Sequence, residues 1–493
     1  MSRLEAVYQR LPIWMQHTIC SGIGWRVQRT RFGPGFRRHL EQAEERMKWS
    51  EDRLLAYRDE RLRTFVGHCA KTVPYYRNLF DRLGITPEQI RTVDDLKRLP
   101  VLTKEEVQSN HPDLLSKAVP WRRRLIVRTS GTTGSSLSFA TTLDAIQQQW
   151  AVWWRYRRWH GIEPGTWHGV FGGRSVVPLT QKSPPFWRDN LPGRQIFFSG
   201  YHMNSENLPA YIEEIRRRQL PWLHGFPSLL TLLAIHLLDT KTDLGYPVRL
   251  ATMGAETLLT QQANLIEQAF GVRPRQHYGQ IEGVGNISEC EQGQLHVDED
   301  FAAVEFLPNT DGPGYRILGT NFSNTATPML RYDTMDIVAL SDAPCSCGRP
   351  GRIVQSIDGR CEDYVVLKNG TQVGRIGRIF MHVVNIREAQ VYQKEAGEVF
   401  IRVARSDGYT AQDEKNLLRE ARLRLGEDAR IHIEYHDRLE RSAAGKLRMV
   451  VSDLKRGRME AILARPSLAE AKRHQREVLE GSQTPVKDVR SEI

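Results

Sequence analysis

The chain has 493 residues, of which 40% are hydrophobic and 26% are charged, an ordinary globular composition that excludes a fibrous or wholly disordered protein. Its longest strongly apolar run, Leu229 to Leu238, spans ten residues, whereas a membrane-spanning helix needs about 20. The apolar stretch near the N-terminus is too short and too polar for a signal peptide. We therefore expect a cytoplasmic protein without a transmembrane helix.

Positive charge is concentrated at the start of the chain. Basic residues outnumber acidic ones by 69 to 58, giving a formal net charge of +11, and residues 1–50 hold nine basic and four acidic side chains. The arginines of this segment alternate with Trp25, Phe32 and Phe36, a pattern that suits peripheral contact with an anionic membrane. A basic, solvated lead-in to the fold is the simpler interpretation, and both stay open.

The chain begins with a predicted helical preface that extends to about residue 118, because apolar side chains recur there at helical spacing, as in Phe65-Val66-Cys69. From Leu125 the pattern changes. A short β-rich run is followed by a loop of small residues, a second strand at Ser138 to Thr141 and a helix that begins near Asp144. This order predicts a strand, a loop, a strand and a helix.

Aromatic and basic residues then mix in the stretch from Trp153 to Trp159. Proteins that bind single-stranded nucleic acid combine the same residue types. At helical spacing, however, the stretch predicts a packed aromatic face with solvated arginines. We therefore expect no nucleic-acid partner.

Short apolar strands alternate with helices between residues 165 and 340, which predicts a large α/β body. After Gly359, shorter strands and two helices, at Glu414 to Gly426 and at Ser452 to Ala464, predict a smaller α+β domain. The expected parts are an N-terminal domain at 1–358, a mobile C-terminal lid at 359–465 and a charged, disordered tail at 466–493.

Three cysteines and one histidine are spaced so that a fold could bring them together. Cys290 and His296 are separated by five residues, and Cys345 and Cys347 follow after a further 48, with Gly348 allowing a tight turn. Without an export signal, clustered cysteines indicate a metal site rather than disulfides. Four such ligands suit tetrahedral Zn²⁺, and scattered reduced cysteines are the alternative.

The loop from Arg128 to Ser136 is rich in glycine and hydroxyl groups. Its backbone N–H groups and hydroxyls can turn toward a polyphosphate, and glycine permits the close approach. It is not a Walker A loop, because no Gly-Lys-Ser/Thr follows. Taken alone, the segment could also be a flexible polar linker.

Further motifs follow this loop in an order that resembles the adenylate-forming superfamily of acyl-CoA synthetases. The branch it resembles most contains phenylacetate–CoA ligases, capsular polysaccharide biosynthesis (CapK) proteins and coenzyme F390 synthetase-like proteins. The resemblance covers about residues 45–465. Its motifs are Thr129 to Gly134, Gly254-Ala255-Glu256, His277 to Glu282, Arg331 to Asp336, Gly359 to Asp363 and Ser442 to Arg448.

The resemblance implies an ATP site in a large adenylation domain. Tyr278 would cover the adenine ring, Asp336 would accept hydrogen bonds from the ribose hydroxyls, and Glu282 would hold Mg²⁺. The residues implied to bind the nucleotide are Thr129, Ser130, Gly131, Gly134, Gly254, Ala255, Glu256, Tyr278, Gly279, Asp336 and Arg360.

The same resemblance implies the catalytic groups. When a carboxylate joins the α-phosphate of ATP, two anions meet, so catalysis consists mainly of positioning and charge stabilisation. Lys446, Thr132 and Thr133 would act on that charge. Glu362 would be the hinge about which the C-terminal lid rotates, bringing Lys446 to the site in one orientation and removing it in another.

The resemblance also implies structural zinc at Cys290, His296, Cys345 and Cys347, because four protein ligands leave no open position for a substrate. The acyl pocket would be shaped by the stretch from His224 to Ser228 and by residues around Gly254 and His277. The identity of the acid does not follow from these residues.

The activity implied is that of an ATP-dependent, AMP-forming ligase that activates a small carboxylic acid as an acyl-adenylate and transfers it to CoA. The stretch from Leu367 to Gly374 lacks the Arg-Gly-Val-Asn-Val run that helps the family to accept CoA, so another acceptor stays open. One alternative is an adenylyl- or acyltransferase of capsular or exopolysaccharide assembly. Another is a catalytically silent scaffold, against which the joint presence of Glu282, Asp336 and Lys446 argues.

Overall fold

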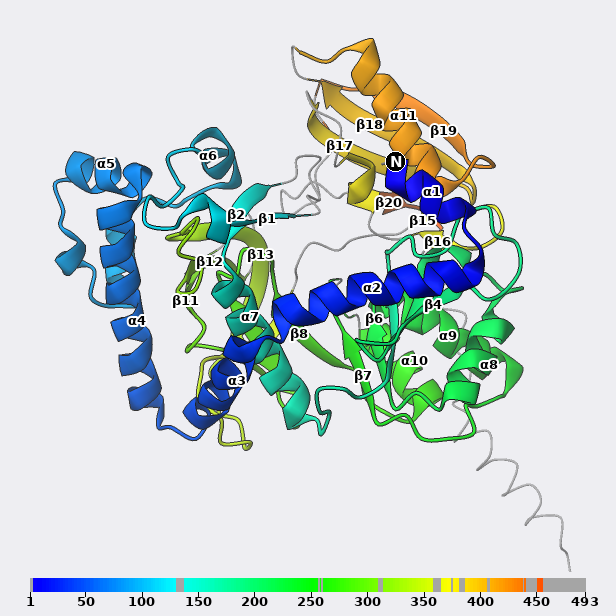
Figure 1. Cartoon of the computed structure of the whole chain (residues 1–493), viewed down its shortest axis with the longest axis horizontal. Helices are drawn as coiled ribbons and strands as arrows, with labels where there is room; N and C mark the ends of the chain where they lie inside the picture. Colours follow the sequence, from blue (N-terminus) through cyan, green and yellow to red (C-terminus); the bar gives the residue numbers. More distant parts are fainter. Residues whose placement is uncertain are drawn as a thin grey trace, which may run out of the picture.

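The computed structural model has a large body with a smaller domain above it (Figure 1). Among the residues it describes, no helix is long and apolar enough to cross a lipid bilayer. The domain boundary near residue 358 and the tail at 466–493 lie outside these residues and stay predictions. The described residues are 3–129, 137–255, 258, 260–308, 314–357, 365–373, 376–380, 386–405, 408–437, 439 and 450–454.

Helices form the start of the chain. The hydroxyl of Ser50 caps α4 by accepting the N–H of Arg53 at 3.4 Å, and two acidic residues in the first turn favour the positive end of the helix dipole. The helices are α1 (Arg3–Arg10), α2 (Ile13–Arg31), α3 (Pro34–Arg46), α4 (Glu51–Thr72), α5 (Pro74–Leu83) and α6 (Lys104–Ser109), with short 3₁₀ turns η1 (Pro87–Gln89), η2 (Val93–Arg98) and η3 (Trp121–Arg123).

A sheet of 12 strands runs through the large body. Its strands β3, β5, β6, β7 and β8 are parallel to one another, while the flanking strands are antiparallel. In sheet order the strands are β11 (Ala302–Pro308), β12 (Tyr315–Asn321), β13 (Tyr332–Ser341), β14 (Ile353–Ile357), β10 (Leu295–Val297), β9 (Asn286–Glu289), β8 (Arg275–Gly279), β7 (Leu250–Met253), β6 (Trp222–Gly225), β3 (His168–Gly172), β5 (Gln195–Ser199) and β4 (Trp187–Asn190).

The predicted strand, loop, strand and helix around residues 125–159 are present: β1 (Leu125–Arg128) pairs with β2 (Ser138–Thr141), and α7 (Leu143–Trp159) follows. Parallel strands are normally covered by helices. The helices that follow α7 are α8 (Leu208–Arg218), α9 (Pro227–Thr240) and α10 (Thr260–Phe270), with a 3₁₀ turn η4 (Gly200–His202). The apolar run Leu229 to Leu238 lies on α9 and packs into the main core.

The arginines of α7 correct one prediction. Arg155 and Arg157 are buried, with 0% and 4% of their surface exposed, so the expected solvated arginines are wrong at these positions. Arg155 donates to Asp298 at 2.6 Å and to Asp300 at 2.8 Å. Arg46 of α3 donates to Asp300 at 2.7 Å. A buried charge is stabilised by such pairing, and periodicity alone does not reveal the distant partner.

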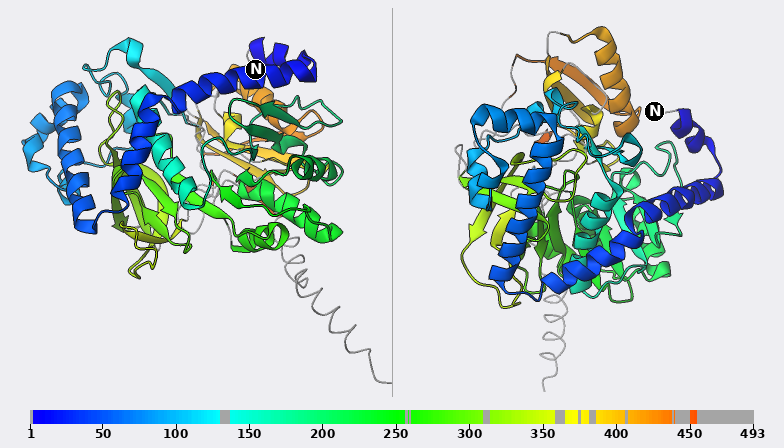
Figure 2. Two further views of the ribbon diagram at one scale, coloured as in Figure 1. Left: turned by 60° about the horizontal axis from the view of Figure 1, so that its bottom comes forward. Right: turned by 60° about the vertical axis from the view of Figure 1, so that its left-hand side comes forward.

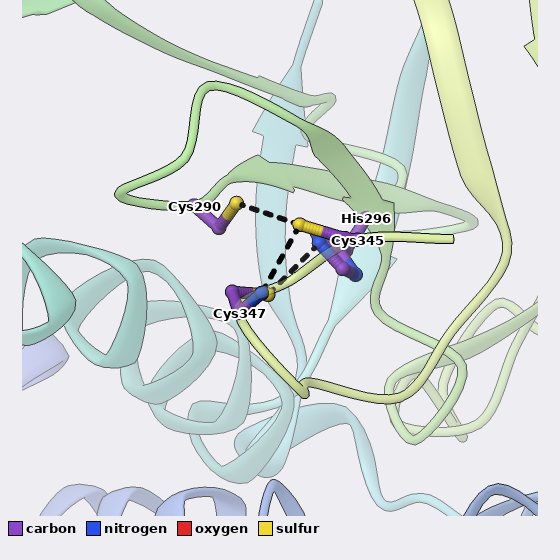
Figure 3. A group of neighbouring side chains, drawn as sticks. All are labelled: Cys290, His296, Cys345 and Cys347. Atoms are coloured by element: carbon purple, nitrogen blue, oxygen red, sulfur yellow. Dashed lines mark hydrogen bonds between the residues drawn. The ribbon is translucent and has the colours of Figure 1, made fainter. Parts of the chain in front are cut away.

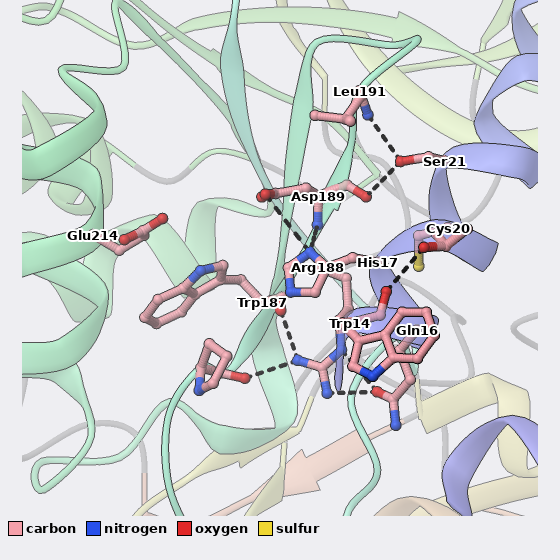
Figure 4. A network of polar contacts seen from close by, with 12 residues as sticks. Trp14, Gln16, His17, Cys20, Ser21, Trp187, Arg188, Asp189, Leu191 and Glu214 are labelled. Carbon is pink, nitrogen blue, oxygen red and sulfur yellow. Dashed lines mark hydrogen bonds and ion pairs between the residues drawn. The ribbon is translucent and has the colours of Figure 1, made fainter. Parts of the chain in front are cut away.

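Helix α2 lies along the outside of the large body (Figures 1 and 2) and is fixed to β4 by buried polar contacts (Figure 4). The guanidinium Nε of Arg188 donates to Gln16 Oε1 at 2.7 Å, and Arg188 is fully buried. Further along the helix, Gly24 lies so close to Asn190 that a Cβ atom would overlap that amide. The helix and the sheet are therefore in direct contact.

The smaller domain is a four-stranded sheet packed on α11 (Ala411–Leu425). Its strands, in sheet order, are β19 (Arg430–Tyr435), β18 (Glu398–Arg405), β17 (Ile386–Gln393) and β20 (Val450–Ser452), and the pair β15 (Val365–Val366) and β16 (Gln372–Val373) precedes them with the 3₁₀ turn η5 (Ile376–Phe380).

The predicted helix at Ser452 to Ala464 is wrong at its first residue. Ser452 ends β20, because the β-branched pair Val450-Val451 extends alongside β17, with Val450 opposite Val391. Residues 455–464 of that prediction lie outside the described residues. The other predicted helix of this domain coincides with α11.

Candidate active site

A cavity of about 430 Å³ lies where the parallel strands of the large body end. Gly172 ends β3, Gly225 ends β6, Gly279 ends β8 and Gly254 follows β7, and all four line the cavity. Ligands of open α/β sheets bind outside the carboxyl ends of the strands. A cavity of this volume can hold a small-molecule ligand.

The cavity brings together residues that are far apart in the sequence. The predicted nucleotide and Mg²⁺ residues on its wall are Thr129, Gly254, Ala255, Gly279 and Glu282. The predicted acyl-pocket residues on its wall are His224, Gly225, Phe226, Gly254 and His277. The remaining predicted residues of the nucleotide and catalytic sets, apart from Tyr278 and Asp336, lie outside the described residues: Ser130, Gly131, Thr132, Thr133, Gly134, Glu256, Arg360, Glu362 and Lys446.

Thr129 holds the base of the hydroxyl-rich loop at the cavity wall. Its N–H donates to the carbonyl of Leu137 at 2.8 Å, and its Oγ1 accepts the N–H of Leu137 at 3.0 Å. These two bonds join the end of β1 to the start of β2. Thr129 and Leu137, which flank the segment 130–136, are therefore joined to each other, and Thr129 lies on the cavity wall.

Tyr278 and Asp336 are hydrogen-bonded to each other. The hydroxyl of Tyr278 donates to Asp336 Oδ2 at 2.8 Å and accepts from Gln280 Nε2 at 3.3 Å. Burial, together with the charge of Asp336, raises the pKa of Tyr278, which keeps the phenol a neutral donor. Next to Asp336 in the sequence, Met335 has φ of 63°, a left-handed backbone conformation that residues other than glycine rarely adopt.

Glu282 is the one acidic residue among the described residues of the cavity wall. Its backbone carbonyl accepts from Asn321 Nδ2 at 3.1 Å, which holds this turn against β12. A carboxylate is the kind of hard oxygen ligand that Mg²⁺ takes together with substrate phosphates. The donor therefore fits the magnesium role that the sequence predicts.

Sequence reasoning missed the aromatic and basic part of the wall, which comes from α7. Trp150, Trp153 and Arg157 line the cavity beside His277, and the indole Nε1 of Trp153 donates to Asn286 Oδ1 at 2.9 Å. In the sequence, this stretch stands out only by its mixture of aromatic and basic residues. The order of elements is the signal that could have predicted its position. A helix that directly follows the β1–β2 pair lies close to the loop between those two strands.

The four predicted metal ligands form one cluster at the ends of β9, β10 and the β13–β14 connection (Figure 3). Cys290 Sγ lies 3.6 Å from Cys345 Sγ, and Cys347 Sγ lies 3.3 Å from His296 Nε2. All four ligand atoms lie within 4.8 Å of one another. Tetrahedral zinc with Zn–S bonds of about 2.3 Å separates its sulfur ligands by about 3.8 Å, so the cluster fits Zn²⁺.

Backbone N–H groups surround the two closely spaced thiols. The N–H of Cys347 points to Cys345 Sγ at 3.5 Å, and that of Arg349 points to Cys347 Sγ at 3.4 Å. Between them Gly348 has φ of 72°, which supplies the tight turn that the sequence predicts. Such contacts around the ligand atoms orient thiolates for a metal.

These features define the class of protein by fold. The crystal structure of 2-hydroxyisobutyryl-CoA ligase in complex with 2-HIB-AMP and CoA in the thioesterification state aligns with a TM-score of 0.55 at 18% identity, and it covers 89% of this chain and 94% of that chain. The chain therefore has the α/β fold of an adenylate-forming ligase, with a large N-terminal and a smaller C-terminal part, as predicted.

The chain also has relatives by sequence. Protein CapK of Staphylococcus aureus is 26% identical over 461 residues, which cover 92% of this chain and 100% of that protein. The phenylacetate-coenzyme A ligase of Escherichia coli (strain K12) is 26% identical over 352 residues, 65% of this chain and 74% of that enzyme. The family model of the CapK C-terminal domain matches residues 365–453. Homologues of this chain thus include CapK and phenylacetate-CoA ligases, and the predicted resemblance is confirmed.

Proposed function

We propose that the chain is an ATP-dependent, AMP-forming ligase that activates a small carboxylic acid as an acyl-adenylate and transfers the acyl group to CoA. The observation that carries this proposal is the cavity, whose wall combines Thr129, Gly254 and Glu282 at the carboxyl ends of the parallel strands. The homology to phenylacetate-coenzyme A ligases supports the same reaction.

In the first half-reaction, a carboxylate oxygen of the acid forms a bond to the α-phosphorus, and the bond from that phosphorus to the bridging oxygen of pyrophosphate breaks. Tyr278 and Asp336 would orient adenine and ribose, and Thr129 and the loop that follows it would hold the phosphates. A magnesium ion, when bound to Glu282, supplies positive charge to the phosphate oxygens. Lys446 would stabilise the charge that develops between the two anions.

In the second half-reaction, the CoA thiol attacks the acyl carbon, and the bond from that carbon to the AMP oxygen breaks. The smaller domain would rotate about Glu362 and withdraw Lys446 from the site between the two steps. We propose the boundary of this mobile domain near residue 358.

A second candidate is an adenylyl- or acyltransferase of surface-polysaccharide assembly, in which a sugar takes the place of CoA. The match to CapK favours it, since that match extends over 92% of this chain and includes the C-terminal domain. The first half-reaction is common to both candidates, so only the acceptor differs.

We propose that Cys290, His296, Cys345 and Cys347 hold a structural Zn²⁺. The closed set of four ligands leaves no position for a substrate. The cluster joins the β9–β10 hairpin to the β13–β14 connection, so the metal would stabilise this end of the sheet.

We also propose that the protein is cytoplasmic and contacts an anionic membrane through the outer face of α1 and α2. The large apolar side chains exposed there are Val7, Ile13, Trp14, Ile23 and Trp25. The segment 13–31 contains no acidic residue, and its exposed side chains include Arg26 and Arg29. This combination is typical of helices that lie at a membrane interface.

The test of the main proposal is release of pyrophosphate by the purified chain with Mg-ATP and a panel of aryl, fatty and hydroxy acids, with and without CoA. Release that depends on one acid and is accelerated by CoA is the expected result. Acid-dependent release without stimulation by CoA would favour the polysaccharide transferase. No release with any acid would contradict both and favour the scaffold.

A further inference from the structure

A second cavity, also of about 430 Å³, lies between α2 and the sheet. It shares six wall residues with the active-site cavity: Trp150, Arg157, Val170, Arg174, Phe197 and His224. The two cavities therefore adjoin along a common wall. We call the second one the α2 chamber.

Arg157 lies on the common wall with only 4% of its surface exposed. Its Nη1 donates to the carbonyl of Trp153 at 3.0 Å, and its Nε has no hydrogen-bond partner. The guanidinium carbon lies 5.3 Å from the ring centroid of Trp154 and 5.5 Å from that of Trp222. Within the described residues it forms no ion pair with a carboxylate.

Arg31, at the end of α2, brings a second positive charge to the chamber. Its guanidinium carbon lies 4.1 Å from the ring centroid of Trp150. Burial, followed by repulsion from Arg174 and Arg157, lowers the pKa of Arg31 to about 9, and burial lowers that of Arg157 to about 10. Both arginines thus lie among aromatic rings without a compensating anion from the described chain.

Arg155, two residues before Arg157 on the same helix, has acidic partners, whereas Arg157 has none among the described residues. Arg155 is equally buried, but Asp298 and Asp300 neutralise it. No aspartate or glutamate occurs among the described residues that line the α2 chamber. A buried charge without a partner is energetically costly. The surroundings of Arg157 therefore suit a bound ligand that brings its own anionic group.

The histidines that line the two cavities do not add to the positive charge. Burial and the charge of Arg157 lower the pKa of His224, and they lower the pKa of His277 and of His168 to about 3. These imidazoles are therefore neutral near pH 7. Recognition of an anion in the chamber falls to the arginines.

We propose that the α2 chamber receives the distal end of the acid substrate and that this end carries a second anionic group, a carboxylate or a phosphate, which pairs with Arg157 and Arg31. This inference rests on the proposed adenylation reaction and names its substrate class: an acid with a second negative charge. Guanidinium groups bind both kinds of anion through paired N–H donors.

The test compares acids of matched length in acid-dependent exchange of pyrophosphate into ATP by the full chain. The pairs are succinate with butyrate, adipate with hexanoate, and 3-phosphonopropionate with butyrate. We expect kcat/KM to be at least about 10-fold higher for the doubly charged member of a pair, because a buried arginine gains its missing partner. Equal or higher values for the singly charged acids would overturn the inference and leave the proposed function intact.

Variants separate the chamber from the reaction itself. Arg157→Met and Arg31→Met should each lower the ratio of kcat/KM for the doubly charged acid to kcat/KM for the singly charged acid by at least about 10-fold. Arg122→Met is the matched control, since Arg122 stacks on the exposed Trp121 outside both cavities. Equal losses for both acids would contradict the anion-binding role. Arg31 and Arg157 lie on different helices. If one of the two variants does not fold, the other variant still tests the inference.

A binding measurement decides the inference even if no acid supports exchange, a result that would contradict the proposed function. Calorimetric titration of the full chain with adipate, hexanoate and inorganic phosphate should show that adipate binds more tightly than hexanoate and that Arg157→Met removes the difference. Tighter binding of phosphate than of adipate would identify the phosphate-bearing acids as the class. No difference between adipate and hexanoate would overturn the chamber's role.

Discussion

The hydroxyl of Tyr278 donates to Asp336 at 2.8 Å, although the two residues belong to β8 and β13, which are not neighbours in the sheet. The sheet therefore brings the residue predicted to cover adenine and the residue predicted to bind ribose to one place. A nucleotide held by both would be fixed at its base and at its sugar.

Removal of the Asp336 carboxylate is expected to weaken ATP binding. Asp336→Ala should raise the Kd for ATP by about 10- to 100-fold, because a hydrogen bond to a charged group contributes about 1.5–3 kcal/mol. Tyr278→Phe keeps the aromatic face and loses only the hydroxyl, so its effect should be smaller. Equilibrium binding of ATP to the three proteins measures both effects. Unchanged affinity in Asp336→Ala would remove this residue from the nucleotide site.

Lys446 is expected to act in the reaction rather than in binding. Lys446→Ala should lower the rate of acid-dependent pyrophosphate exchange by about 100-fold or more, as loss of a group that stabilises transition-state charge does, while the Kd for ATP changes little. Lys415→Ala, on the exposed face of α11, is the control. A variant with wild-type exchange would show that Lys446 has no part in catalysis.

The cysteine and histidine cluster predicts one zinc ion per chain. Elemental measurement of the purified protein should find it, and Cys345→Ser or a strong chelator should remove it and lower the Tm. Cys20→Ser is the matched control, since Cys20 is a buried, free cysteine outside the cluster. It should retain the metal. A protein that never contains zinc would contradict the proposal.

The buried ion pairs of Asp300 predict a stability effect that depends on pH. Burial alone raises the pKa of Asp300, but Arg155 and Arg46 outweigh it and lower the pKa to about 2. The folded value lies below the unfolded value of about 3.9, so the stabilisation is complete above pH 4 and is lost as the pH falls toward 2.

Asp300→Asn should therefore lower the free energy of unfolding at pH 7 by about 3–5 kcal/mol, since it leaves buried arginines partly uncompensated. Urea denaturation at several pH values gives the difference between the two proteins, which should shrink below pH 4. Asp342→Asn, at an exposed position, serves as the control. A difference that stays constant down to pH 2 would show that the carboxylate does not carry this stabilisation.

The outer face of α2 predicts association with anionic vesicles. Arg26→Gln combined with Arg29→Gln should weaken binding to vesicles that contain phosphatidylglycerol by about 30-fold, at about 1 kcal/mol for each charge. Trp14→Ala should weaken binding independently of salt. The binding is measured by sedimentation of the protein with these vesicles and, for comparison, with vesicles of pure phosphatidylcholine. Equal sedimentation with both lipids would contradict the membrane contact.

Local patterns in the sequence predicted much of the fold. The β1–β2 pair with α7 after it, the helices of the large body and the spacing of the four metal ligands all depend on neighbouring residues or on short motifs. Gly254-Ala255 follows β7 directly, so the position of this motif at the carboxyl edge of the sheet could be expected.

What the sequence did not predict depends on contacts between distant segments. Arg155 and Arg157 look alike in the sequence, yet Arg155 is paired with residues about 145 positions away, and Arg157 lines the α2 chamber, which has no carboxylate among its described wall residues. The adjoining chamber could not be predicted either, because its wall combines α2, α3, α7 and four strands of the sheet. The local sequence predicts a helix at Ser452, because its strand partner Gln393 lies more than 50 residues earlier and does not enter a local pattern.

Gly24 is a position at which the shape of the α2 chamber can be changed. Because a Cβ at this position would overlap the side-chain amide of Asn190, an alanine there would displace either that amide or the helix, while the Gln16–Arg188 contact holds the N-terminal part of α2. Gly24 and Asn190 both line the chamber, so either displacement would change its wall. A single methyl group at residue 24 is thus a means of changing the range of acids that the chamber accepts without replacing either arginine.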